Sequence, residues 1–210
     1  MSLTLIIGDK TYSSWSLRAT LAVELTGAVY DEQLIALNRP DTRAQILQHS
    51  PTGKVPLLIS EDGPVWDSLA IAEYLAERFV DAQLWPQARD ARALARSACA
   101  EMHSGFVALR THLPMDLKRN QALAEIPADA MADIQRICAL WAECRQRFGH
   151  GGAFLFGQPC LADAFFAPVA ARLRSYQVVL PAEAAAYVEA TYQWSAFQRW
   201  YQAALEEHLA

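Results

Sequence analysis

The order of strand-like and helix-like segments in the first 80 residues constrains the fold more than any other feature. Short apolar runs typical of strands alternate with segments whose apolar residues recur at helical spacing, in the order β-α-β-α-β-β-α. Such alternation predicts a small α/β sandwich, with a parallel βαβ unit first and an antiparallel hairpin later. We expect strands at 3–7, within 29–37, at 55–60 and at 64–66, and helices from Ser14 or Ser16 to Thr26, at 41–48, and from a cap at Asp67 or Ser68 to Phe79.

The second half of the chain is predicted to be entirely helical. A short linker at 81–87 contains Trp85-Pro86, and a segment rich in Ala, Leu and Arg then favours one helix over 88–112. Further helices are expected at 127–148, 161–174, 182–189 and 194–209. The chain is therefore expected to contain two units, an α/β unit at 1–80 and an all-α unit at 88–210.

Composition and charge exclude several classes of function. The 210 residues are 53% hydrophobic, which argues against a disordered chain. Lys and Arg number 18 against 23 Asp and Glu, and no basic stripe stands out, so we expect neither nucleic acid nor an anionic membrane as a partner. The four cysteines include no Cys-x-x-Cys pair, and no signal peptide or long apolar run is evident. We expect a cytoplasmic protein with free thiols.

A hydroxyl-rich motif, Tyr12–Arg18, lies at the junction of the first strand and the first helix. Backbone N–H groups and the helix dipole stabilise negative charge at such a junction. The hydroxyl of Ser13, Ser14 or Ser16 can therefore help to hold a carboxylate, a phosphate or a thiolate. The alternative is that these serines serve only as turn and cap residues.

A proline at the start of a strand marks a second motif, Ser50–Leu58. A cis peptide bond at Val55–Pro56 would turn the N–H and C=O of Val55 outward, where they can pair with an extended peptide. The alternative is a trans proline at the edge of the sheet.

The third motif, Val65–Leu75, begins the third expected helix. The Ser68 hydroxyl and nearby N–H groups can hold a carboxylate, and Asp67 can hold an ammonium group. The alternative is a plain helix cap. A thiolate site, a backbone-pairing edge and an α-amino-acid site, in this order, are together the parts needed to hold γ-glutamyl-cysteinyl-glycine, which is glutathione.

On these motifs the chain resembles the cytosolic glutathione transferases over essentially its whole length. The resemblance implies a thioredoxin-like first half, an all-helical second half that completes the pocket for an electrophile, and a homodimer formed through residues 68–79 and the helix that follows. Ser13–Arg18 further resembles the Ser-Ser-Cys motif of the zeta class, the maleylacetoacetate isomerases, and Pro159–Ala164 resembles the family's buried helix cap.

The resemblance also assigns roles to individual residues. Ser13 would stabilise the glutathione thiolate, with Ser14 as the alternative. The remaining contacts would come from Val55 and a cis Pro56 for the cysteinyl backbone, Asp67 and Ser68 for the γ-glutamyl end, and Lys54 or else His49 for the glycyl carboxylate.

Two residues depart from the family pattern. Trp15 stands where the zeta motif has cysteine, and Cys160 stands where the helix cap normally has Ser or Thr, with Asp163 three residues later serving the fold. The first departure argues against zeta-type isomerisation, but it leaves activation of the thiol by serine intact.

These observations lead to three functional hypotheses. The first is a glutathione S-transferase that conjugates a small electrophile, as in detoxification, with no metal. The second is a cis–trans isomerase of the maleylacetoacetate type, with Arg18 and Arg110 holding substrate carboxylates. The third is a glutathione-binding protein without turnover. Cys99 and His103 lie four residues apart but have no further metal ligands at suitable spacing. Glu101 and Arg110, expected on the same helix as His103, are candidates for the border of the second-substrate pocket.

Overall fold

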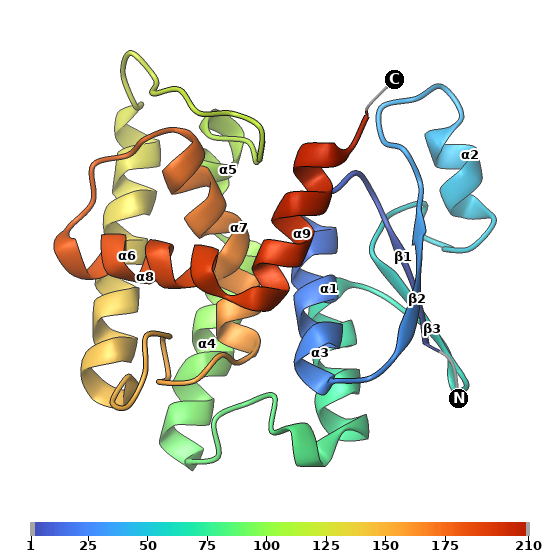
Figure 1. The fold of residues 1–210 in the computed structure, drawn as a ribbon, viewed down its shortest axis with the longest axis horizontal. Helices are drawn as coiled ribbons and strands as arrows, with labels where there is room; N and C mark the ends of the chain where they lie inside the picture. Colours follow the sequence, from blue (N-terminus) through green and yellow to red (C-terminus); the bar gives the residue numbers. More distant parts are fainter. Residues whose placement is uncertain (1–2, 209–210) are drawn as a thin grey trace.

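The first half of the chain forms a four-stranded mixed sheet in a computed structural model that describes residues 3–208 (Figure 1). The strand order is β2-β1-β3-β4, with β1 parallel to β2 and antiparallel to β3, and β3 antiparallel to β4. The expected parallel unit followed by a hairpin is therefore confirmed. The strands are β1 Leu3–Ile7, β2 Tyr30–Leu34, β3 Leu57–Ser60 and β4 Gly63–Val65.

Three helices cover the two faces of this sheet. Helices α1 (Ser14–Thr26) and α3 (Ser68–Arg78) lie between the sheet and the second half, while the short α2 (Thr42–Leu47) lies on the outer face (Figure 1). On that outer face Ile46 of α2 joins a small apolar cluster with residues of the sheet. Helix α1 ends at Gly27, whose φ of 70° is a left-handed conformation that suits glycine.

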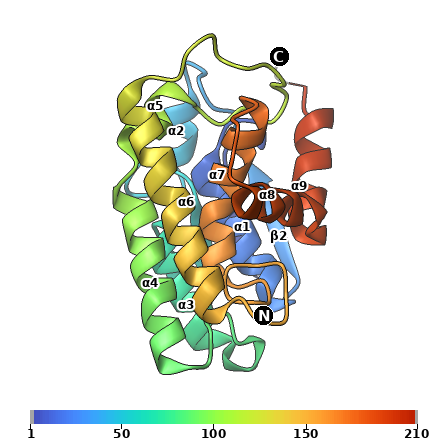
Figure 2. The same ribbon diagram turned by 90° about the vertical axis from the view of Figure 1, so that its left-hand side faces the viewer.

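The second half is helical, as expected. A 3-10 turn at Val80–Ala82 precedes it, and in Figure 2 α4 and α6 lie side by side. The helices are α4 Arg89–Ser104, α5 Val107–His112, α6 Ala128–Phe148, α7 Leu161–Ser175, α8 Ala182–Gln193 and α9 Ser195–Glu206. The expected end of the last helix at Leu209 lies outside the described residues.

The prediction of one helix over 88–112 is wrong, because the chain breaks between α4 and α5. Gly105 is extended there, and a Cβ at this position would lie 2.7 Å from the carbonyl oxygen of Glu101. Phe106 follows with a φ of 53°, which turns the chain into α5. Arg110 therefore does not share a helix with Glu101 and His103.

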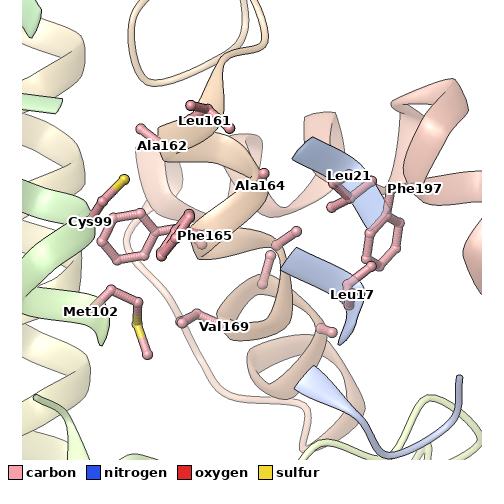
Figure 3. Packing of buried hydrophobic residues seen from close by; sticks show 14 of the residues in the cluster. Leu17, Leu21, Cys99, Met102, Leu161, Ala162, Ala164, Phe165, Val169 and Phe197 are labelled. Carbon is pink, nitrogen blue, oxygen red and sulfur yellow. The ribbon is translucent and has the colours of Figure 1, made fainter. Parts of the chain in front are cut away.

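Helix α7 forms the centre of the apolar core. Every residue of it except Arg174 is buried. Figure 3 shows Phe165 and Val169 of α7 facing Cys99 and Met102 of α4. The same core cluster continues through α1 into the first half, so the two halves share one apolar interior. Within residues 3–208, the helices are all too short or too polar to span a bilayer.

Candidate functional site

One cavity of about 530 Å³ brings together residues that are far apart in the sequence. It opens between the first half and α5. Six of the residues expected at the site, Arg110 among them, line it together with three others. The lining residues are Trp15, Thr52, Lys54, Val55, Pro56, Trp66, Asp67, Ser68 and Arg110.

The Val55–Pro56 segment forms one wall of the cavity. The peptide bond between these two residues is cis, as the resemblance implied. Val55 precedes the first residue of β3, and its backbone is not paired with any described strand. An extended peptide has an open backbone to pair with at this edge. Lys54 is exposed on the same wall, whereas His49 does not line the cavity and its Nε2 lies 3.3 Å from Nε2 of Gln33.

The start of α3 forms another wall of the cavity. Asp67 is the helix cap, since its Oδ1 accepts hydrogen bonds from the N–H groups of Leu69 at 3.0 Å and Ala70 at 3.5 Å. Ser68 beside it is fully buried, and its Oγ has no hydrogen-bond partner among residues 3–208. Buried hydroxyls nearly always have a partner, so this unpaired one in a cavity wall marks a place for a polar group of a ligand.

His103 reaches this wall from the second half. Its Nε2 lies 3.1 Å from Oδ2 of Asp67, and its ring meets the ring of Trp15 edge-on at 5.1 Å. Its Nδ1 is buried without a partner in the described part of the chain. No local sequence signal predicts the contact with Asp67, because it depends on how α4 packs against the first half.

Cys99, considered with His103 as a metal pair, does not belong to this site. It is fully buried in the core, where burial raises the pKa of its thiol well above the usual value. Over the described residues, no group of three or more His, Cys, Asp or Glu side chains is arranged to hold a metal ion.

Ser13 and Ser14 lie at the start of α1, directly before Trp15 of the cavity wall. Ser13 is the helix cap: its Oγ lies 2.7 Å from Oγ of Ser16 and accepts from the Ser16 N–H at 3.4 Å. The Ser14 hydroxyl accepts a hydrogen bond from Nη2 of Arg172 at 3.3 Å. Neither serine is among the residues that line the cavity, and both are only slightly exposed. Their role toward a thiolate stays a prediction.

The Trp15 side chain contacts two arginines. The guanidinium of Arg18 lies 4.4 Å from the centre of a Trp15 ring, and that of Arg110 lies 5.1 Å from it. Arg110 lines the cavity, as expected for the second-substrate pocket. Glu101 does not, because it forms a two-bond ion pair with Arg136 of α6, with distances of 2.7 and 2.8 Å.

A second cavity, of about 590 Å³, lies between α6 and residues 179–184. It has largely apolar walls that include Trp141 and Cys138. None of the residues expected at the site lines it, so the chemistry suggested by the sequence belongs to the smaller cavity.

Comparison with known protein families identifies the segment that builds most of the smaller cavity. The sequence model of the "Glutathione S-transferase, N-terminal domain" family matches residues 12–78. A probable maleylacetoacetate isomerase of Caenorhabditis elegans is 31% identical over 94 residues, which are 45% of this chain and 44% of that protein. Glutathione S-transferase 1 of Dianthus caryophyllus is 27% identical over 166 residues, 74% of this chain and 71% of that protein. The match thus spans less than half the length of the nematode relative.

Solved structures extend the similarity of fold to the whole chain. A glutathione transferase homologue from Burkholderia, with bound glutathione, has a TM-score of 0.73 at 22% identity and covers 99% of this chain and 100% of that one. The holo structure of maleyl pyruvate isomerase, a bacterial zeta-class glutathione S-transferase, has a TM-score of 0.73 at 24% identity, covering 97% and 98%. At these identities the similarity establishes the fold.

Proposed function

Since residues 12–78 of this chain match the sequence model of the glutathione S-transferase N-terminal domain, we propose that the smaller cavity binds glutathione and that the protein joins the glutathione sulfur to an electrophile as a thioether. The observation that carries this proposal is the meeting of separate motifs at one cavity. Val55 and Pro56 with their cis bond, Ser68 with its unpaired hydroxyl, and Trp15 from the first turn of α1 line the same cavity. Each feature fits a different part of one tripeptide.

The binding roles follow from the chemistry of each wall. The Ser68 hydroxyl and the start of α3 hold the γ-glutamyl carboxylate, while Asp67 holds the ammonium group. The N–H and C=O of Val55, presented by Pro56, pair with the cysteinyl backbone. Lys54, exposed at the end of the same wall, binds the glycyl carboxylate.

Activation of the thiol is assigned to Ser13, with Ser14 as the alternative. A hydroxyl that donates to sulfur at the positive end of α1 favours the thiolate over the thiol and lowers its pKa. The thiolate then uses its electron pair to form a carbon–sulfur bond. The leaving group departs with the electrons of the bond that breaks. The donor stabilises charge and forms no covalent bond itself.

Under the same proposal the two halves of the chain have different functions. Residues 1–80 bind glutathione, and residues 88–210 complete the pocket for the electrophile through His103 and Arg110. We place the protein in the cytoplasm, where its four free cysteines stay reduced. We also propose a homodimer through α3 and α4, which a native mass measurement tests.

Conjugation of a chlorodinitrobenzene-type electrophile tests the main proposal. Wild-type protein is expected to bind glutathione and to form the thioether. Ser13→Ala should reduce the rate by roughly 10²-fold, in the range for loss of one donor to developing charge. It should also shift the pH dependence of the rate to higher pH. Ser14→Ala distinguishes the two serines. Full activity of Ser13→Ala with the wild-type pH profile would exclude Ser13, and failure to bind glutathione would exclude both the transferase and the isomerase function.

The two arginines around Trp15 favour a second candidate function. A cis–trans isomerase of a diketo acid has an anionic substrate, and Arg110 together with Arg18 provides positive charge beside the cavity. Glutathione adds to the conjugated double bond, the resulting single bond rotates, and the thiol leaves with the bond restored. Isomerisation of maleylacetone tests this function, and Arg110→Gln should weaken it while sparing conjugation of a neutral electrophile.

A third candidate is a glutathione-binding protein without turnover. The bulky Trp15 in place of cysteine, and a Ser13 hydroxyl that is engaged with Ser16, are the observations in its favour. Tight binding of glutathione without activity toward a panel of electrophiles would support it. Measurable conjugation or isomerisation would exclude it.

A further inference from the structure

Ser16, which the proposed mechanism does not use, forms a hydroxyl pair with Ser13. It lies in the first turn of α1 and is fully buried. Its Oγ is 2.7 Å from Oγ of Ser13 and accepts a hydrogen bond from the backbone N–H of Gly8 at 3.0 Å. The two hydroxyls thus connect the end of β1 to the cap of α1.

The proton positions in this pair are restricted by the neighbouring groups. A serine hydroxyl carries one proton and two lone pairs. Gly8 occupies one lone pair of Ser16, so Ser16 can either accept the proton of Ser13 or donate its own proton to Ser13. In the structure Ser13 donates to Ser16. In the reverse arrangement Ser13 accepts from both the N–H and the O–H of Ser16, and its own proton is free to point elsewhere.

We propose that Ser16 is a positioning residue that directs the Ser13 proton toward the sulfur of glutathione. This inference rests on the proposed function. When a thiolate arrives, both hydroxyls rotate: Ser16 donates to Ser13, and Ser13 donates to sulfur. Each proton stays on its own oxygen, and no covalent bond is made or broken. A hydroxyl that accepts two hydrogen bonds becomes a stronger donor, because hydrogen bonds in a chain polarise one another.

The pair also explains why Ser13 and Ser14 would differ. The Ser14 hydroxyl accepts from Arg172 and does not contact Ser16 in the hydrogen bonds that the described residues make. Only Ser13 has a neighbouring hydroxyl that can exchange the roles of donor and acceptor. The Ser16 hydroxyl should therefore influence the thiol through Ser13 alone.

Titration of the thiol of bound glutathione, followed by the ultraviolet absorbance of the thiolate, tests this inference. Ser16→Ala is expected to raise the pKa of the bound thiol by about 0.5 to 1, which corresponds to the loss of one hydrogen bond. The conjugation rate near neutral pH should fall by roughly three- to tenfold, with little change in glutathione affinity. Ser16→Thr keeps a hydroxyl and should restore both values.

A double substitution separates positioning from a structural role. In a Ser13→Ala background, Ser16→Ala should have no further effect on the thiol pKa, because the Ser13 hydroxyl through which Ser16 acts is already absent. Ser16→Ala also leaves the Gly8 N–H without an acceptor and can impair folding. Ser16→Cys, similar in shape but a weak donor, then takes its place and should raise the thiol pKa in the same direction.

The outcomes distinguish this inference from the function on which it rests. If Ser13→Ala raises the thiol pKa and Ser16→Ala or Ser16→Cys does not, the inference is wrong and the transferase proposal stands. An additive effect in the double variant would also overturn it. If glutathione does not bind, or if Ser13→Ala leaves the thiol pKa unchanged, the proposed role of Ser13 fails first.

Discussion

Arg18 is a charged residue in the interior, held mainly by aromatic rings. Its side chain is 1% exposed, and its guanidinium lies over rings of Trp15 and Phe165 at 4.4 and 5.4 Å. Its Nε and Nη1 have no hydrogen-bond partner among the described residues. Burial, followed by the nearby charge of Arg172, lowers its pKa to about 9. A buried charge with unpaired N–H groups lowers the stability of the fold. Next to Trp15 in the cavity wall, the same charge contributes positive electrostatic potential.

Replacement of Arg18 by an apolar residue is expected not to destabilise the fold. Arg18→Met removes a buried charge with unpaired N–H groups, so the free energy of unfolding should stay the same or rise by up to about 4 kcal/mol. Arg172→Met is the matched control: Arg172 is also buried, but it donates to Leu113 O at 2.9 Å and to Ser14 Oγ at 3.3 Å. The control should lose roughly 2–3 kcal/mol. Equal losses in urea unfolding of the two variants would contradict this account.

Single residues were predictable where a local rule applied. A helix cap at Asp67 or Ser68 follows from a local rule, and the cis bond before Pro56 was implied by the family resemblance; the structure has Asp67 as the cap, and the bond is cis. The contact of His103 with Asp67 could not be predicted, because it depends on packing between segments distant in the sequence.

Among the elements, α7 shows how a buried helix start is stabilised. Cys160 and Asp163 form a capping box, in which Oδ2 of Asp163 accepts the Cys160 N–H at 2.9 Å. Oδ1 of the same carboxylate accepts the Leu155 N–H at 3.1 Å and the Tyr187 hydroxyl at 3.0 Å. Burial raises the pKa of Asp163 to about 6, and these hydrogen bonds oppose the rise.

The raised pKa of Asp163 predicts a pH dependence of stability with a definite sign. The folded protein holds this proton more tightly than the unfolded chain, whose aspartate has a pKa near 3.8. The contribution is therefore fully present below pH 3.8 and is lost as pH rises to about 6. Asp163→Asn should be less stable than wild type by about 1–3 kcal/mol, because its NH₂ group opposes a backbone donor.

The difference between wild type and Asp163→Asn should accordingly narrow as pH rises between 3.8 and about 6. Thermal melts of the two proteins across this range provide the measurement. Asp31→Asn, on the exposed strand β2, is the control and should show no such trend. A difference that widens with rising pH would show that the Asp163 pKa is lowered instead.

Helix positions were largely predictable from caps and glycines, and the exception has a clear cause. The Ala, Leu and Arg content of 88–112 favours a helix throughout, and only Gly105 indicates the break. The left-handed conformation of Phe106 has no sequence signature of its own. As a result, Arg110 was expected on the same helix as His103 and lies instead on α5, whereas its predicted position at the border of the pocket is confirmed.

At the scale of the whole molecule, the two halves are joined through one core. Helix α1 packs against α7 and α9, and all three belong to a single apolar cluster. The order of elements was enough to predict a mixed sheet followed by helices. The contact between the halves was not predictable, because α7 is apolar on nearly every side and shows no periodic face to orient it.

Glu207, the residue that follows α9, forms hydrogen bonds with the loop that leads into Ser13. Glu207 accepts the N–H groups of Lys10 at 2.8 Å and Thr11 at 3.0 Å, and the Thr11 hydroxyl at 2.8 Å. The indole N–H of Trp200, on α9, also donates to Lys10 O at 3.0 Å. One carboxylate from the second half therefore satisfies three donors of the β1–α1 loop.

Loss of this carboxylate should loosen the loop and lower overall stability. Glu207→Gln replaces one acceptor oxygen by an NH₂ group that opposes a backbone donor, so we expect a loss of about 1–3 kcal/mol in the free energy of unfolding. One of the Lys10 and Thr11 amides loses its acceptor, and because the loop is then held less firmly, both amides should exchange with deuterium faster than in wild type. Glu206→Gln, on the exposed side of α9, is the matched control and should change neither measurement. Unchanged exchange at Lys10 and Thr11 in Glu207→Gln would show that other contacts hold the loop, and that the second half does not restrain the segment before Ser13 through this carboxylate.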